Sequence, residues 1–434
     1  MRWRMLAVVT LAQVTASFAT QGLGALSGAV HDAFALSGAE VGLMVTAVGL
    51  APVFSLFVVG HLVDRHGERW VVAIGSLVMT AGLAATSMAP GYAVVLASLF
   101  FAGVGYSTVQ PGGGKSVTSW FPAGRRGVAM GVRQAGLPIG GAAAAAVLPG
   151  AAHALGWQAA FAVAAAVALA GGVVFTLAYR PPPDTARRTR PEPGDHVRQT
   201  RREPRHRVRR KQPEPRDHVR RTRREQPDDA RLLPGLARTL RRPWLRPVLW
   251  SGVPLVGAQF CLTAHLMLFT RDHFHRPLSQ GAVLLALLQA GGVTGRVLLA
   301  YLSDHTRGSR LSAVRISMLC SALFLALLPV LPARTPFGVL AAVTAALGFF
   351  VIGWYGPWVA HIADAAPDDS VGRAMGAAMG ANQVAIVAAP PLLGLLHDSS
   401  GSYLITWWLP AATLTACALR TAQPDACPVA TTRP

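Results

Sequence analysis

The sequence predicts an all-α membrane protein of twelve transmembrane helices, arranged in two related six-helix halves. Of its 434 residues, 52% are hydrophobic and 14% are charged, whereas soluble domains carry roughly 25% charged residues. The apolar residues form runs of about 20, which is the length needed to cross the hydrocarbon core. Short patterns from the first half also recur in the same order in the second half.

The apolar runs place the twelve helices. They cover residues at about 5–30, 40–61, 70–89, 92–118, 127–151, 157–179, 246–271, 279–302, 311–332, 336–362, 373–397 and 402–420. Arginines and lysines gather in every second connection, with the connection at 271–276 as the exception. Because basic residues collect on the cytoplasmic side, this pattern predicts an inner or plasma membrane protein with both termini in the cytoplasm.

One segment carries most of the charge. Between residues 180 and 246 there are 22 Arg or Lys and 9 Asp or Glu, so this segment supplies +13 of the net charge of +20. It is rich in proline and has little apolar surface to bury, which is typical of disorder. We therefore expect a first bundle at 1–180, a cytoplasmic linker at 181–243, a second bundle at 244–420 and a tail at 421–434. The linker is predicted to be a solvated spacer, with contact to anionic lipid as the alternative.

Two repeated patterns relate the halves. The pattern P-x4-G-x-A-M-G begins at Pro122 and again at Pro367, 245 residues later, and Asp64 recurs as Asp304 at an offset of 240. Similar offsets in the same order indicate two halves in parallel orientation.

The connection after the second predicted helix holds a glycine, aspartate and arginine pattern. Its members are Gly60, Asp64, Arg65, Gly67 and Arg69. The pattern resembles the signature G-x3-D-R-x-G-x-R of the major facilitator superfamily, and the second half holds a degraded copy with Asp304 and Arg307. The resemblance implies that this loop latches the inner gate. The alternative is plain topology, since the positive-inside rule explains the charge but not the spacing.

A glycine-rich stretch on the fifth predicted helix also resembles a signature of this family. It contains Gly131, Gly136, Pro138, Gly140 and Gly141. Glycines allow helices to approach closely and proline can kink a helix, so we expect these residues to serve helix packing.

Polar side chains are placed at helical spacing within several apolar runs. They are Gln13, Ser17 and Gln21 on the first helix, Tyr106 and Gln110 on the fourth, Gln259, Thr263 and His265 on the seventh, and Trp354 and Tyr355 on the tenth. The family resemblance implies that these four helices line a central path, so we take these residues as candidate substrate contacts. The alternative is that they bond neighbouring helices.

Two arginines lie inside predicted helices, Arg133 on the fifth and Arg296 on the eighth. Charges inside membranes are costly and are usually functional, although an arginine near a helix end can extend to the interface instead. Glu40 stands at the first position of the second predicted helix, and no Asp or Glu lies inside any of the predicted helices. Because arginine matches carboxylate and phosphate geometry, this favours an anionic substrate over the cationic drugs that buried carboxylates serve.

We therefore predict secondary transport of a small solute, by symport or antiport, with an organic or inorganic anion as substrate and a proton as candidate coupling ion. Within transport, the rival is efflux of hydrophobic drugs. From another class, the rival is a transporter-like sensor or scaffold that acts through the basic linker. No nucleophile–base pair, nucleotide-binding loop or metal-ligand spacing is found, so the sequence predicts no enzyme, no cofactor, no metal and no specific nucleic-acid partner.

Overall fold

The computed structural model describes residues 1–121, 123–181, 243–305, 309–365 and 371–421. Nearly the whole predicted tail and linker lie outside these ranges, as does Arg307.

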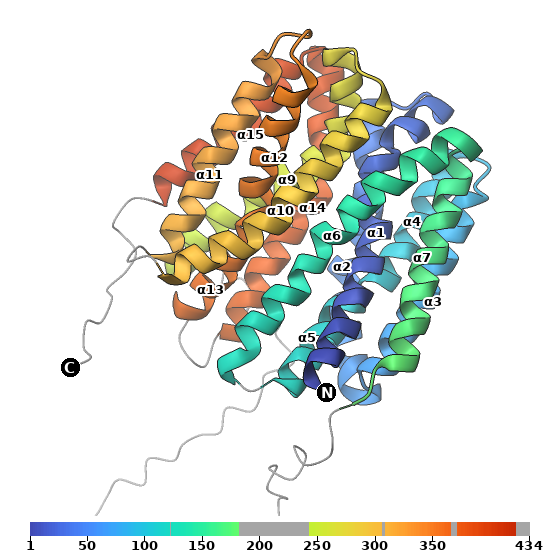
Figure 1. Cartoon of the computed structure of the whole chain (residues 1–434), viewed down its shortest axis with the longest axis vertical. Coiled ribbons are helices and arrows are strands. Elements are labelled where there is room, and N and C mark those ends of the chain that lie inside the picture. Colours follow the sequence, from blue (N-terminus) through green and yellow to red (C-terminus); the bar gives the residue numbers. More distant parts are fainter. Residues whose placement is uncertain (122, 182–242, 306–308, 366–370, 422–434) are drawn as a thin grey trace, which may run out of the picture.

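The described elements are all helices, apart from short connections (Figure 1). The first half contains α1 (Arg2–Phe34), α2 (Gly38–His66), α3 (Glu68–Ser87), α4 (Tyr92–Tyr106), α5 (Val109–Trp120), α6 (Ala123–Leu155) and α7 (Trp157–Ala178). The second half contains η3 (Pro243–Leu245), α9 (Arg246–Phe274), α10 (Leu278–His305), α11 (Arg310–Leu327), η4 (Leu328–Val330), α12 (Phe337–Gly353), α13 (Tyr355–Ala365), α14 (Val371–Ser400) and α15 (Tyr403–Arg420).

Within the described residues, eleven helical spans are long and apolar enough to cross a membrane. Two of them join consecutive α-helices, α4 with α5 and α12 with α13. The remaining helix, α15, packs in the second half beside α11 and α9 (Figure 1). The two bundles predicted from the sequence are thus present.

The two halves repeat each other in backbone detail. The fourth span is interrupted at Ser107 and Thr108, and the tenth is interrupted at Trp354. The first span of each half ends in the same way, because Ala35 after α1 and His275 after α9 both adopt a left-handed conformation with φ of 51°.

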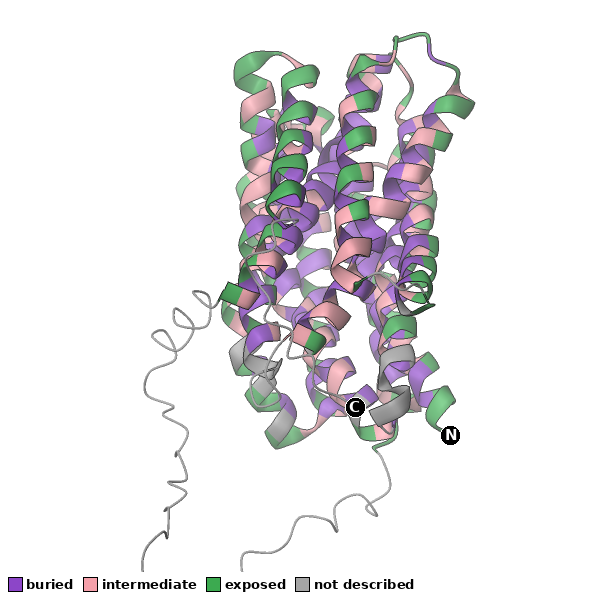
Figure 2. Cartoon of the chain, turned by 90° about the vertical axis from the view of Figure 1, so that its left-hand side faces the viewer, coloured by how far each residue is buried: buried purple, intermediate pink, exposed green. Residues whose placement is uncertain are grey.

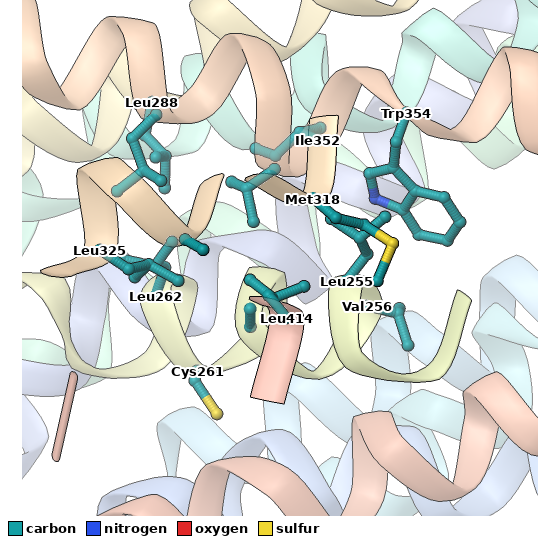
Figure 3. Packing of buried hydrophobic residues seen from close by; sticks show 14 of the residues in the cluster. Leu255, Val256, Cys261, Leu262, Leu288, Met318, Leu325, Ile352, Trp354 and Leu414 are labelled. Carbon is teal, nitrogen blue, oxygen red and sulfur yellow. The ribbon is translucent and has the colours of Figure 1, made fainter. Parts of the chain in front are cut away.

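Each half has its own buried apolar cluster. In the second half, Leu255, Met318 and Trp354 pack together from α9, α11 and the break after α12 (Figure 3). Large apolar side chains such as Phe54 and Leu323 face outward instead, at 66% and 63% exposure. Figure 2 shows this contrast between a buried interior and an exposed rim, which suits helices surrounded by lipid.

Among the described residues, hydrogen bonds join the bundles from the middle to one end. We call the end where α1 begins and α15 finishes the terminal end, and the opposite end the distal end. Hydrogen bonds between the bundles in the described chain include Arg296–Gln134, Gln383–Gly49, Thr46–Val387, Arg271–Asp32, and the bonds of Asp398 to Gly38 and Ala39. All lie at the middle or toward the distal end.

At the distal end, α2 and α14 contact each other largely through backbone atoms. The Asp398 carboxylate at the end of α14 accepts from the Gly38 and Ala39 amides at 2.9 Å each, and these amides open α2. A carboxylate at a helix N-terminus satisfies unpaired N–H groups and favours the helix dipole. Gly42 also has no room for a Cβ, which would overlap the Pro391 nitrogen. The two helices therefore meet backbone to backbone at the distal end.

Candidate functional site

Two buried arginines, one from each bundle, lie at the middle of the interface. Arg133 on α6 is 2% exposed and Arg296 on α10 is 8% exposed. Neither extends to an exposed end of its helix, so the alternative of an interfacial side chain does not describe them. The acceptors that hold them lie beside the helix breaks before α5 and after α12, and beside Pro138 in α6.

Arg133 is held by the residues that open α5. Its Nη2 donates to the Gln110 side-chain oxygen at 2.9 Å and to the backbone carbonyls of Val109 and Gln110 at 3.1 Å each. The same nitrogen donates to Gln13 Oε1 on α1 at 3.1 Å. Gln13 in turn donates to Ser17 one turn on, at 3.1 Å. The break before α5 therefore places carbonyls where the guanidinium needs acceptors.

A glycine makes room for this guanidinium. A Cβ at Gly113 would overlap Arg133 Nε. At the next position the space is open, because a Cβ at Gly114 would meet nothing within 4 Å. The run of three glycines at 112–114 superficially resembles a phosphate loop. Its middle glycine is needed because any side chain there would overlap Arg133.

Arg296 faces the same region from the other bundle. Its Nε donates to the Ile352 carbonyl at 3.2 Å, in the last turn of α12. Carbonyls in that turn lack helical donors and carry the negative end of the dipole. Its Nη1 donates to the Gln134 carbonyl on α6 at 2.5 Å, which links the bundles. The guanidinium carbon lies 5.4 Å from the Tyr355 ring centre, within range of a cation–π interaction.

The two positive charges have no acidic partner in the part of the chain that the structure describes. None of the ion pairs found there includes Arg133 or Arg296. Both guanidinium groups instead interact electrostatically with the Tyr106 and Tyr355 side chains. Buried charges are ordinarily paired or bound to a ligand, so the site presents two cations that an anion would neutralise.

Several buried polar atoms in the helices have no hydrogen-bond partner among the described residues. They are Arg133 Nε, Gln134 Oε1, Gln21 Oε1, Gln289 Nε2 and Asn382 Oδ1. Gln134, Gln289 and Asn382 were missed as candidates by the sequence reasoning. A polar residue inside an apolar run was the signal that could have found them.

The structure brings together only part of the predicted substrate set. Five predicted residues surround the two arginines. They bond a guanidinium, interact with it electrostatically or, in one case, bond Gln13, and they are Gln13, Ser17, Tyr106, Gln110 and Tyr355. The other predicted members, Gln21, Gln259, Thr263, His265 and Trp354, have no hydrogen bond to either arginine in the described chain.

Three of those other residues, His265, Thr263 and Trp354, make structural contacts away from the two arginines. His265 Nε2 is bonded to the Pro390 carbonyl at 2.9 Å, and it lines a small cavity near the distal end together with Asp398. The Thr263 carbonyl lies where α1 and α9 cross, since a Cβ at Gly24 would overlap it. Trp354 is fully buried at the helix break among apolar side chains (Figure 3).

The two remaining predicted contacts, Gln21 and Gln259, come from different bundles. Gln21 lies beside Gly141, where a Cβ would also come 2.7 Å from the Gln289 amide of the other bundle. Gln259 is buried on α9, and its carbonyl accepts from the Thr263 hydroxyl at 3.0 Å.

The predicted packing glycines on α6 behave differently from one another. Gly140 approaches α1, where a Cβ would overlap the Val14 carbonyl, and Gly136 lies against Gln13. A Cβ at Gly131 would meet nothing within 4 Å. The expectation of close packing is therefore corrected for Gly131, where a side chain would face open space. Pro138 lies buried inside α6.

The predicted gating loop is only partly described. Gly67 adopts a φ of 80° between α2 and α3, and Arg69 Nε donates to the Thr176 carbonyl near the end of α7 at 2.8 Å. Arg65 is exposed. Gly60 lies within α2, and the side chains of Asp64 and Asp304 lie outside the part that the structure describes. Lys115 of α5 donates to the Val63 carbonyl beside this loop at 2.9 Å, away from the two arginines.

Comparisons with known proteins agree on one family. The family model of the Major Facilitator Superfamily matches residues 9–390. An uncharacterized MFS-type transporter of Mycobacterium tuberculosis (strain CDC 1551 / Oshkosh) is 26% identical over 415 residues, covering 94% of this chain and 82% of the relative. A galacturonate transporter of Dickeya chrysanthemi is 24% identical over 192 residues, covering 44% of this chain and 56% of the relative.

The solved structures agree on the fold. A bacterial homologue of the human lysosomal transporter Spinster, in an inward-facing and unoccupied conformation, matches with a TM-score of 0.67. It is 13% identical in sequence, and the match covers 96% of this chain and 94% of that one. At this identity the likeness concerns the fold alone.

Proposed function

Because this chain belongs to the Major Facilitator Superfamily and is a multi-pass membrane transporter, we propose that its substrate is a small organic anion held between Arg133 and Arg296. The observation that carries the proposal is the pair of buried guanidinium groups, which have no carboxylate partner among the described residues. A carboxylate accepts from a guanidinium through two parallel hydrogen bonds. It would neutralise a charge whose burial is otherwise costly.

The two arginines come from different bundles, which suits alternating access. An anion bound to both would connect the bundles at the middle, around which one bundle rocks against the other. Among the described residues, the hydrogen bonds between bundles run from the middle to the distal end, which supports a state closed at the distal end. With the termini in the cytoplasm, as the charge pattern predicts, that state faces inward.

The neutral groups around the arginines favour a hydroxylated anion. Gln13, Gln110 and Tyr355 supply amide and phenol groups beside the guanidinium pair. Such groups discriminate strongly for hydroxyl groups, because their polar atoms stay unpaired when the hydroxyl is missing. The relatives named as galacturonate and sulfoacetate transporters support an acidic substrate.

In the opposite state, the loop with Asp64, Arg65 and Arg69 would steady the terminal gate. Arg69 already anchors this loop to α7 in the present state. The gate assignment follows from the motif and from the position of the loop at the terminal end.

A thermal-shift screen on the purified full-length chain tests the proposal. Galacturonate, glucuronate, sulfoacetate and acetate are compared with lipophilic cations and neutral drugs. We expect saturable stabilisation by a carboxylate that is lost in both Arg133→Ala and Arg296→Ala. Stabilisation by cations or neutral drugs alone, unchanged in these variants, contradicts the proposal.

A further inference from the structure

A proline on α6 leaves one backbone carbonyl without its usual donor. Pro138 lies inside the helix and has no N–H, so it cannot bond the carbonyl four residues earlier. That carbonyl belongs to Gln134, and Arg296 of the other bundle donates to it at 2.5 Å. The free acceptor and the cation that fills it therefore come from opposite bundles.

The second half has a matching arrangement on α14, in which the proline belongs to the second bundle and the donor to the first bundle. Pro391 in α14 leaves the Val387 carbonyl free, and Thr46 Oγ1 on α2 donates to it at 2.5 Å. In each case the proline lies on the fifth span of one half, and the donor lies on the second span of the other half. The two contacts differ in one respect, because the donor is charged in one and neutral in the other.

We propose that the Gln134 carbonyl is the resting acceptor of Arg296 and that a bound anion replaces it at Nη1. Pro138 is then a positioning residue that connects substrate occupancy with contact between the bundles. The anion part of this inference rests on the proposed function, whereas the contact between Pro138, Gln134 and Arg296 does not.

The chemistry favours the exchange. A carboxylate offers a guanidinium a full negative charge and two parallel hydrogen bonds, whereas the Gln134 carbonyl is neutral and accepts a single bond. Arg296 already commits Nε to the Ile352 carbonyl, so a carboxylate that binds through two nitrogens takes the Nη pair. The direct bond between bundles is then lost, and the anion, which also contacts Arg133, takes its place. The neutral hydroxyl of Thr46 offers an anion no such gain.

The first test needs no substrate. Pro138→Ala restores an N–H that closes the helical bond to Gln134 and removes this carbonyl from Arg296. Hydrogen–deuterium exchange of the unliganded full-length chain should then be several-fold faster at the distal ends of α2 and α14. Arg296→Gln should have a similar effect, and the double variant should add little to either one. A normal exchange pattern in Pro138→Ala overturns the contact as a stabilising element.

A matched control lies on the same helix. Pro149→Ala also restores a helical N–H, but we find no donor from the other bundle on the Ala145 carbonyl in the described part of the chain. It should leave the distal exchange rate unchanged. Pro138→Val keeps more of the side-chain volume, so agreement between the Val and Ala variants excludes a simple cavity effect.

The second test measures galacturonate and sulfoacetate binding by calorimetry. Pro138→Ala should bind the anion several-fold more tightly, because the competing carbonyl is withdrawn. Pro391→Ala should raise distal exchange while the affinity stays within twofold. Unchanged or weaker affinity in Pro138→Ala overturns the exchange at Nη1. If the wild type binds neither anion, this exchange falls with the proposed function, and the deuterium experiment still decides whether the contact holds the bundles.

Discussion

The two halves of the site hold their arginines in different ways. Arg133 makes its hydrogen bonds to oxygen within its own bundle, to acceptors on α1 and α5. Arg296 makes one bond within its bundle and one across to Gln134. The comparison suggests a fixed charge in the first half and an exchangeable charge in the second half.

The largest expected effect comes from removing the fixed charge. Arg133→Ala leaves the side-chain oxygens of Gln13 and Gln110 without this donor, at a cost of about 1–3 kcal/mol for each unsatisfied buried group. We expect anion affinity to fall by about 10²-fold or more, which is roughly 2.7 kcal/mol. Calorimetry measures the affinity, and chemical denaturation of the same sample measures the loss of stability. Wild-type affinity in this variant would exclude Arg133 from the site.

Removal of the exchangeable charge should cost similar affinity but less stability. Arg296→Ala removes the donor of two acceptor oxygens, whereas Arg133→Ala removes the donor of four. We expect about a 10²-fold loss of affinity and a smaller fall in unfolding free energy than in Arg133→Ala. Equal destabilisation by both variants would contradict the distinction between the two halves.

A backbone change next to Arg133 should separate affinity from stability. Gly113→Ala places a Cβ against Arg133 Nε, so the guanidinium must shift. The shift weakens hydrogen bonds of Arg133, but alanine favours a helix over glycine by up to about 1 kcal/mol. We therefore expect a smaller loss of stability than in Arg133→Ala, together with about tenfold weaker anion binding. Gly114→Ala is the matched control, since its Cβ meets open space. Equal effects at both positions would sink this explanation.

The distal end should respond more weakly. Asp398→Ala removes the carboxylate that accepts from Gly38 and Ala39, and loss of a helix cap costs about 1 kcal/mol. We expect about fivefold faster deuterium exchange at the start of α2, with little change in anion affinity. Ser399→Ala serves as the control because that hydroxyl bonds only its own helix, at the Leu396 carbonyl. Slow exchange at α2 in Asp398→Ala would show that the cap is dispensable.

The smallest effect is expected at the exposed ion pair between Asp32 and Arg271. Their side chains are 55% and 29% exposed and lie 2.7 Å apart, and exposed pairs contribute about 0–1 kcal/mol. Asp32→Asn should change the melting temperature slightly at low salt and not at all at high salt. A large change that persists in high salt would contradict this assignment.

Much of the fold could be predicted because the membrane constrains it. Apolar length located the spans, and the offsets shared by Asp64 with Asp304 and by Pro122 with Pro367 identified the repeat. Arg133 and Arg296 stood out because charges inside apolar runs are rare. Helical spacing could show that Gln13 and Ser17 share a face, but not which neighbour that face meets.

The cross-bundle chemistry could not be predicted in the same way. The role of Pro138 depends on the partner that its freed carbonyl meets, and Arg296 is 158 residues further along the chain. His265 was grouped with the site because of its helix, yet its ring is bonded to Pro390 near the distal end. Such distinctions depend on depth along the helix and on packing between bundles, which a single sequence does not supply.

The most direct test of the anion site is uptake of radiolabelled galacturonate and sulfoacetate into liposomes that contain the purified full-length chain. We predict saturable uptake of at least one anion by the wild type, its loss in both Arg133→Ala and Arg296→Ala, and its retention in Gly114→Ala. If the wild type instead moves only neutral or cationic compounds, at rates that neither arginine substitution changes, the two guanidinium groups do not form a substrate site.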